Sequence, residues 1–171
     1  RVHEFIKPKK PIGLSREDQE NKIVVVGVPV GLVRALIPAA NPTAPVICQA
    51  CIGLRGGCAV SFSPPPSAKN CIIETVKIVR STLEDLGLPK NLITCLTTPT
   101  KEATDTLMKH PKMNLILATG GNAMVHAAYS SGTPALGVGP GNGPSFIERS
   151  ADIPLAVKRI FDSKTFDNGT I

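Results

Sequence analysis

The chain has 171 residues, of which 42% are hydrophobic and 19% are charged, and its net charge at pH 7 is +6. This length suits one domain with its own core, and no apolar run approaches the ~20 residues that a membrane-spanning helix needs. With one Tyr, five Phe and no Trp, few rings are present for base stacking, which argues against nucleic-acid binding. We therefore expect a soluble globular protein, and its basic charge favours phosphate-bearing small molecules as ligands.

The predicted elements alternate between strands and helices along the chain. Residues 1–21 read as a polar lead-in, and residues 22–38 predict one or two extended segments bent between Gly27 and Gly31. Short apolar runs predict further strands at residues 58–63, 92–96, 115–119 and 135–138. Helical spacing predicts helices at residues 45–54 with Thr43 as cap, from Ser67 to Gly87, from Thr100, at 122–129, and at 155–161 after Ser150 or Asp152.

This alternation, with connections of about two to six residues, is typical of a parallel sheet covered by helices. The predicted fold class is α/β: a doubly wound, mostly parallel Rossmann-like sheet with helices on both faces. Right-handed crossovers place every strand-to-helix turn at the carboxyl edge of such a sheet, where these folds bind ligands. The candidate functional residues are therefore expected in those turns.

Five cysteines and no secretion signal predict reduced thiols and a cytoplasmic location. Cys48 and Cys51 form a CxxC pair, which is compatible with a metal or redox site. No second pair follows at a matching spacing, and the three histidines offer no paired ligands. We favour the alternative that Cys51 lies on the apolar face of a helix, and we predict no metal site.

Four turns, rich in Gly, Pro and Asn, have the composition of ligand-binding loops: IPAANPT at 37–43, FSPPPS at 62–67, ATGGN at 118–122 and GVGPGNGP at 137–144. Backbone N–H groups at a helix start can bind a phosphate, but glycine and proline also simply make tight connections. Asn41 has two interpretations: an amide donor to an oxyanion, or a helix cap. Local chemistry alone favours the cap.

No residue of the chain has the sequence context of a catalytic nucleophile. No serine lies in a GxSxG elbow, and no cysteine lies in a polar turn with a nearby His or Glu. The residues by themselves therefore predict a nucleotide-binding α/β domain.

Taken together, these motifs resemble the CoA-acylating aldehyde dehydrogenases, including the microcompartment enzymes and the aldehyde half of bifunctional aldehyde-alcohol dehydrogenases. The segments IPAANPT, FSPPPSAKN, LILATGGNAMVHAAYSSGTPALGVGPGNGPSFIERSADI and SKTFDNGTI occur in the family's order and spacing. In that family the residue after the FDNGTI-like segment is the catalytic cysteine, which attacks the aldehyde, passes hydride to NAD and leaves a thioester that coenzyme A collects. The resemblance thus implies an NAD-binding domain at residues 22–171 that stops just before this cysteine and is inactive alone.

The resemblance also implies roles for individual residues. Asn41 corresponds to the oxyanion-hole side chain, which reverses the local preference for a cap. The strand-end turn with Ser63, Pro64 and Pro66 corresponds to the site of the adenosine part of NAD, and of coenzyme A. Thr119, Gly120 and Gly121, at the end of the strand predicted at residues 115–119, correspond to the turn where the dinucleotide passes close to the backbone.

The strand end beside the nicotinamide corresponds to Gly137, Val138 and Gly139. Hydrolytic aldehyde dehydrogenases carry a water-activating glutamate here, and this chain has glycine. Without a carboxylate to activate water, the thioester survives until a thiol arrives, which favours acyl transfer to coenzyme A. The resemblance further implies a small aldehyde as substrate, a homo-oligomeric parent protein, and a location in the cytoplasm or a bacterial microcompartment. The alternative is a non-catalytic nucleotide-binding module.

Overall fold

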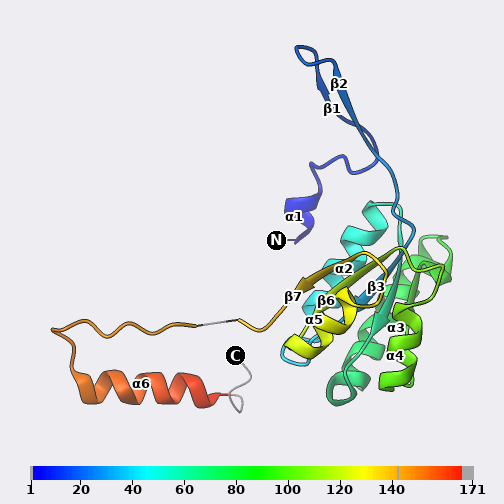
Figure 1. Ribbon diagram of the computed structural model, residues 1–171. Helices are drawn as coiled ribbons and strands as arrows, with labels where there is room; N and C mark the ends of the chain where they lie inside the picture. Colours follow the sequence, from blue (N-terminus) through cyan, green and yellow to red (C-terminus); the bar gives the residue numbers. More distant parts are fainter. Residues whose placement is uncertain (1, 142, 167–171) are drawn as a thin grey trace.

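The computed structural model describes residues 2–141 and 143–166 of the chain (Figure 1). Its centre is a five-stranded parallel sheet in the order β5-β4-β3-β6-β7. The strands are β3 (Leu32–Leu36), β4 (Ala59–Ser63), β5 (Ile93–Cys95), β6 (Leu115–Thr119) and β7 (Ala135–Val138). Helices follow the strands along the chain, so the predicted doubly wound α/β class is confirmed.

The helices are α2 (Thr43–Arg55), α3 (Lys69–Asp85), α4 (Lys101–Met108) and α5 (Asn122–Tyr129) around the sheet, and α1 (Val2–Ile6) and α6 (Ile153–Thr165) near the two ends of the chain. Short 3-10 turns, Pro66–Ala68 and Lys90–Leu92, precede α3 and β5. Two predicted caps are confirmed: the backbone N–H of Ala103 donates to the Thr100 hydroxyl, and that of Leu155 donates to Asp152. Two are wrong, because α2 already includes Thr43 and Ser67 lies inside the 3-10 turn.

An antiparallel hairpin precedes the sheet and projects away from it (Figure 1). Its strands are β1 (Gly13–Asp18) and β2 (Ile23–Gly27). The sequence analysis missed β1 because its residues, GLSRED, are largely polar, and the four between its two ends are exposed. The domain boundary predicted between residues 21 and 22 falls in the turn of this hairpin, and the division itself stays a prediction.

Alternate residues of the central strands face two different helix layers. Val33, Ala35 and Ile37 pack with Val60 and Phe62 against α2 and α3. The opposite face packs against α4 and α5 through a second cluster: Leu36, Met108, Met113, Ile116, Ala118 and Ala128. Parallel strands buried on both faces need such continuous apolar sequences, and this burial fixes the positions of the strand ends.

Candidate functional site

The chain adds strands to the sheet first on one side of β3 and then on the other, so a topological switch point lies between β3 and β6. From β3 the chain adds β4 and then β5 on one side, and then returns to add β6 and β7 on the other side. In doubly wound folds, ligands bind outside the carboxyl ends of the strands at this switch point. The location of the site is therefore set by topology before any side chain is considered.

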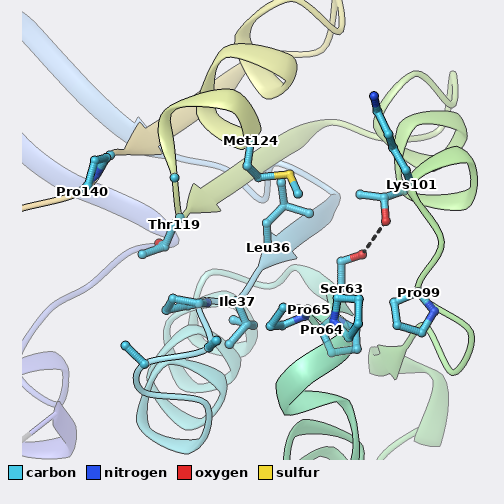
Figure 2. Close-up of a pocket in the computed structure, with 18 of the residues that line it drawn as sticks. Leu36, Ile37, Ser63, Pro64, Pro65, Pro99, Lys101, Thr119, Met124 and Pro140 are labelled. Atoms are coloured by element: carbon cyan, nitrogen blue, oxygen red, sulfur yellow. Dashed lines mark hydrogen bonds between the residues drawn. The ribbon is translucent and has the colours of Figure 1, made fainter. Parts of the chain in front are cut away.

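A pocket of about 630 Å³ lies at this position (Figure 2). All four turns singled out in the sequence contribute to it, and so does the start of α4. Its walls carry many apolar side chains, among them Leu36, Ile37, Pro64, Pro65, Pro99 and Met124 (Figure 2). The polar lining residues are Ser63, Thr100, Lys101, Thr104, Asp105 and Thr119. Such walls suit a flat ring such as adenine, and the few polar groups suit a sugar or phosphate.

Two glycines at the end of β6 leave the pocket open close to the backbone. A Cβ placed on Gly121 would meet no atom within 4 Å, and one on Gly120 would meet only Met124, at 3.8 Å. The protein itself therefore does not require glycine at these positions. Space that a Cβ would fill is what a ligand lying on the backbone needs, so this cradle fits the pyrophosphate-containing part of a dinucleotide.

Most of the residues named from the sequence line this pocket. They are Ser63, Pro64, Pro66, Thr119, Gly120, Gly121 and Gly139. Gly137 and Val138 do not line it. A Cβ on Gly137 would lie 2.6 Å from Val125 and 2.8 Å from the ring of Tyr129, and the Gly137 N–H donates to the Tyr129 hydroxyl at 2.9 Å. The glycine at position 137 thus allows α5 to pack closely on β7.

Asn41 is exposed and lies directly after Ala39 and Ala40, which line the pocket. It does not cap α2, whose N-cap is Pro42 with no side-chain hydrogen bond. The cap favoured by local chemistry is therefore wrong. No hydrogen bond from the Asn41 amide is present among the described residues, which leaves this donor available to a ligand at the pocket edge.

Beneath the pocket, a buried arginine joins a chain of hydroxyl groups. Nη1 of Arg34 donates to Ser61 Oγ at 2.6 Å, and Nη2 donates to Ser63 Oγ at 2.7 Å. Ser63 Oγ in turn lies 3.4 Å from Thr104 Oγ1, as the dashed line in Figure 2 shows. Burial lowers the pKa of Arg34 to about 10, so the guanidinium stays charged at neutral pH. Burial likewise raises the pKa of the nearby Cys95 thiol to about 11, which keeps that thiol neutral.

Sequence reasoning missed Arg34 and the contribution of α4. The pocket includes Thr100, Lys101, Thr104 and Asp105, which lie in the first turn or so of a helix that the sequence did place correctly. The start of α4 could have been predicted as part of the site because it follows the carboxyl end of β5, and all strand-to-helix turns lie at that edge of the sheet. Among the described residues, no three His, Cys, Asp or Glu side chains gather as metal ligands.

Comparison with known proteins places this geometry in a family. A family model, the aldehyde dehydrogenase family, matches residues 6–171. The chain belongs to the aldehyde dehydrogenase family. The chain is 42% identical over 170 residues to the bifunctional aldehyde-alcohol dehydrogenase of Escherichia coli (strain K12). That match covers 99% of this chain and 19% of the relative.

Two solved aldehyde dehydrogenase structures share both fold and sequence with the chain. An acetylating aldehyde dehydrogenase from Geobacillus thermoglucosidasius is 50% identical, with a TM-score of 0.84 over 99% of this chain and 38% of that one. The propionaldehyde dehydrogenase of Rhodopseudomonas palustris with bound propionyl-CoA is 36% identical, with a TM-score of 0.72 over 85% of this chain and 32% of that one. The resemblance to acylating aldehyde dehydrogenases drawn from the sequence is confirmed.

The chain spans about a fifth of the curated relative and less than two fifths of either solved structure. The activity, substrates and partners of those whole proteins are therefore matters of proposal for this chain. Within the described residues, no helix is long and apolar enough to cross a membrane.

Proposed function

We propose that this chain is the cofactor-binding part of an NAD-dependent, CoA-acylating aldehyde dehydrogenase. The pocket at the β3/β6 switch point is the observation that carries the proposal, because it unites four strand-end turns in a chain of this family. The propionyl-CoA bound to the Rhodopseudomonas palustris relative supports an acyl-CoA as product. A small aldehyde is the proposed substrate, and coenzyme A the proposed acyl acceptor.

We propose a definite orientation for the dinucleotide in the pocket. The proline-rich turn after β4 and the start of α4 would hold the adenosine, with Ser63, Thr104 and Lys101 near its ribose. The open backbone at Gly120 and Gly121 would receive the pyrophosphate, and Gly139 at the end of β7 would lie toward the nicotinamide. When bound, NAD supplies the acceptor for the hydride that leaves the substrate carbon.

Asn41 is proposed to donate its side-chain amide to the oxygen of the reacting carbonyl. A donor already held in place stabilises the negative charge that develops on this oxygen in the transition state. The exposed amide without a protein partner is suited to this role, because no existing hydrogen bond has to break first. The cysteine that forms the acyl-enzyme is proposed to follow residue 171 in the natural protein.

The described residues at the end of β7 include no base for hydrolysis of that acyl-enzyme. Gly139, Pro140 and Gly141 line the pocket there, and Asp105 on α4 is the one carboxylate among the described lining residues. Water needs a positioned base to become an effective nucleophile. The proposed outcome is acyl transfer to the thiol of coenzyme A instead of release of a free acid. A homo-oligomeric enzyme in the cytoplasm, or inside a microcompartment, completes the proposal.

The test is NAD reduction by the natural full-length protein with a small aldehyde, in the presence and absence of coenzyme A. Asn41→Ala should lower kcat by about 10²- to 10³-fold, the effect of removing one oxyanion-hole donor, with little change in the affinity for NAD. Asn70→Ala, at an exposed position of α3, is the matched control and should keep wild-type activity. Aldehyde oxidation that ignores coenzyme A and yields the free acid would contradict the acylating reaction.

A peptide map provides an independent check of the nucleophile. The tryptic peptide that begins at Thr165 should continue past Ile171 with a cysteine, and aldehyde with NAD should protect this cysteine from iodoacetamide. Another residue at that position, or a chain without activity that still binds nucleotide, would instead favour the non-catalytic nucleotide-binding module.

A further inference from the structure

Arg34 is a charged residue in the middle of the central strand of the sheet. Its side chain is only 1% exposed, and its neighbours Val33 and Ala35 belong to the apolar core. Within the described part of the chain, no carboxylate lies within ion-pair distance of its guanidinium, and its Nε has no hydrogen-bond partner. An unpaired buried cation is costly, so this arrangement calls for a compensating anion.

The hydrogen bonds of Arg34 fix the direction of the hydroxyls above it. A guanidinium can only donate, so Ser63 Oγ must accept from Nη2. The hydrogen of the Ser63 hydroxyl then points elsewhere, either to Thr104 Oγ1 at 3.4 Å or into the pocket. If Ser63 donates to Thr104, the Thr104 hydroxyl becomes the donor to the pocket. In both cases a donor polarised by Arg34 is presented to the ligand.

The three residues that follow β4 cannot supply backbone donors. Residues 64, 65 and 66 are all proline and therefore have no N–H group. Two side chains that line the pocket can donate to a ligand group beside the end of β4: the hydroxyls of Ser63 and Thr104. Lys101 also lines the pocket, and its ammonium points away from Ser63 (Figure 2). Lys101 and the buried Arg34 are positive, and Asp105 is the one carboxylate among the described lining residues, so the charge in this part of the molecule is net positive.

Topology indicates which part of a dinucleotide lies here. The strand beside the switch-point strand, β4, corresponds to the second strand of doubly wound dinucleotide folds. An acidic residue following the first βα unit of those folds binds the ribose 2′-hydroxyl of NAD, whereas a nearby arginine accommodates the 2′-phosphate of NADP. Here β4 ends in Ser63 backed by Arg34, with no acidic residue from Ser63 to Asn70.

We propose that the end of β4 accepts the 2′-phosphate of NADP, and that Arg34 is the positioning residue that makes this possible by holding Ser63 as a donor and adding an uncompensated positive charge beneath it. The inference rests on the proposed function, because it concerns the same pocket. It extends that function by making NADP a cofactor that binds at least as tightly as NAD.

The test is titration calorimetry of the natural full-length protein with NAD and with NADP, which needs no turnover. Arg34→Met should raise the Kd for NADP by about tenfold, because one buried charge near the phosphate is lost, and the Kd for NAD by much less. Arg34→Lys, which keeps the charge but not the fork that reaches both serines, should give an intermediate Kd for NADP. Arg80→Met on α3, which removes the same charge on the opposite side of the sheet, should change neither Kd.

Each outcome decides the inference. A Kd for NADP higher than the Kd for NAD in the unmodified protein would overturn it and leave the proposed function intact, whereas failure to bind either dinucleotide would end both. Equal weakening of NAD and NADP by Arg34→Met and Arg34→Lys would make Arg34 a purely structural residue and also overturn the inference. If Arg34→Met does not fold, the unmodified protein and Arg34→Lys still give the two decisive comparisons.

Discussion

Successive residues of β3 face two different interiors. Val33 and Ala35 face α2 and α3 in a cluster whose members are all apolar, with Phe62 of β4 fully buried beside them. Arg34 faces the α4 side, where Ser61, Ser63 and Thr104 continue a polar path up to the pocket. The α2/α3 face is thus purely hydrophobic, whereas the α4/α5 face combines an apolar cluster with this hydrogen-bonded path.

The difference between the two faces shows that one face mainly stabilises the fold, whereas the other also carries the polar groups that can bind a ligand. Apolar burial supplies most of the favourable free energy of folding, and the α2/α3 face provides a continuous cluster for it. Buried polar groups add little net stability even when they are satisfied, and they cost free energy when they are not. The α4/α5 face tolerates them at the carboxyl edge of the sheet, where a ligand can use them.

Phe62→Ala gives the largest expected effect and tests the stabilising face. Phe62 is 0% exposed, and removing such a ring should lower the free energy of unfolding by about 3–5 kcal/mol. Because the ring lies on the α2/α3 side, the Kd for NAD of the molecules that remain folded should change little. Urea denaturation and calorimetry measure the two quantities. A large change in Kd with little loss of stability would show that the faces are not separated in this way.

Gly137→Ala gives a smaller loss of stability but tests the recognition face. The new Cβ would meet Val125 and Tyr129 at 2.6 and 2.8 Å, and overpacking of this kind costs about 1–3 kcal/mol. Unlike Phe62→Ala, it should also weaken NAD binding, because α5 must move and its first residues adjoin the Gly120–Gly121 cradle. Thermal unfolding with and without NAD separates the two effects. Unchanged NAD affinity would mean that α5 does not position the cradle.

Much of the fold was predictable from the sequence because burial imposes a period on it. The apolar segments of β6 and β7 and the small-residue helix α5 were predicted with the bounds that the structure shows. The strand β1 was missed because an exposed hairpin strand has no core to impose alternation. Helix starts were less certain: Thr100 caps α4, whereas the prolines around Thr43 and Ser67 shift the helix starts.

The candidate site was predictable to the level of its turns. Parallel topology gathers all strand-to-helix turns at one edge, and glycine or proline marks those turns in the sequence. Arg34 could not be recognised, because an arginine inside an apolar run gives no indication of which side chains lie above it. The role of Gly137 was equally hidden, since its reason lies in Tyr129, eight residues earlier on a neighbouring helix.

Hydrogen–deuterium exchange of the natural full-length protein with and without NAD tests most directly that the switch-point pocket is the dinucleotide site. Binding should slow exchange in peptides that cover the pocket turns, at residues 100–105, 119–124 and 139–141, and leave the hairpin of β1 and β2 unchanged. Protection at these turns would support the pocket as the dinucleotide site. Unchanged exchange there, with protection elsewhere in the chain or none at all, would contradict it.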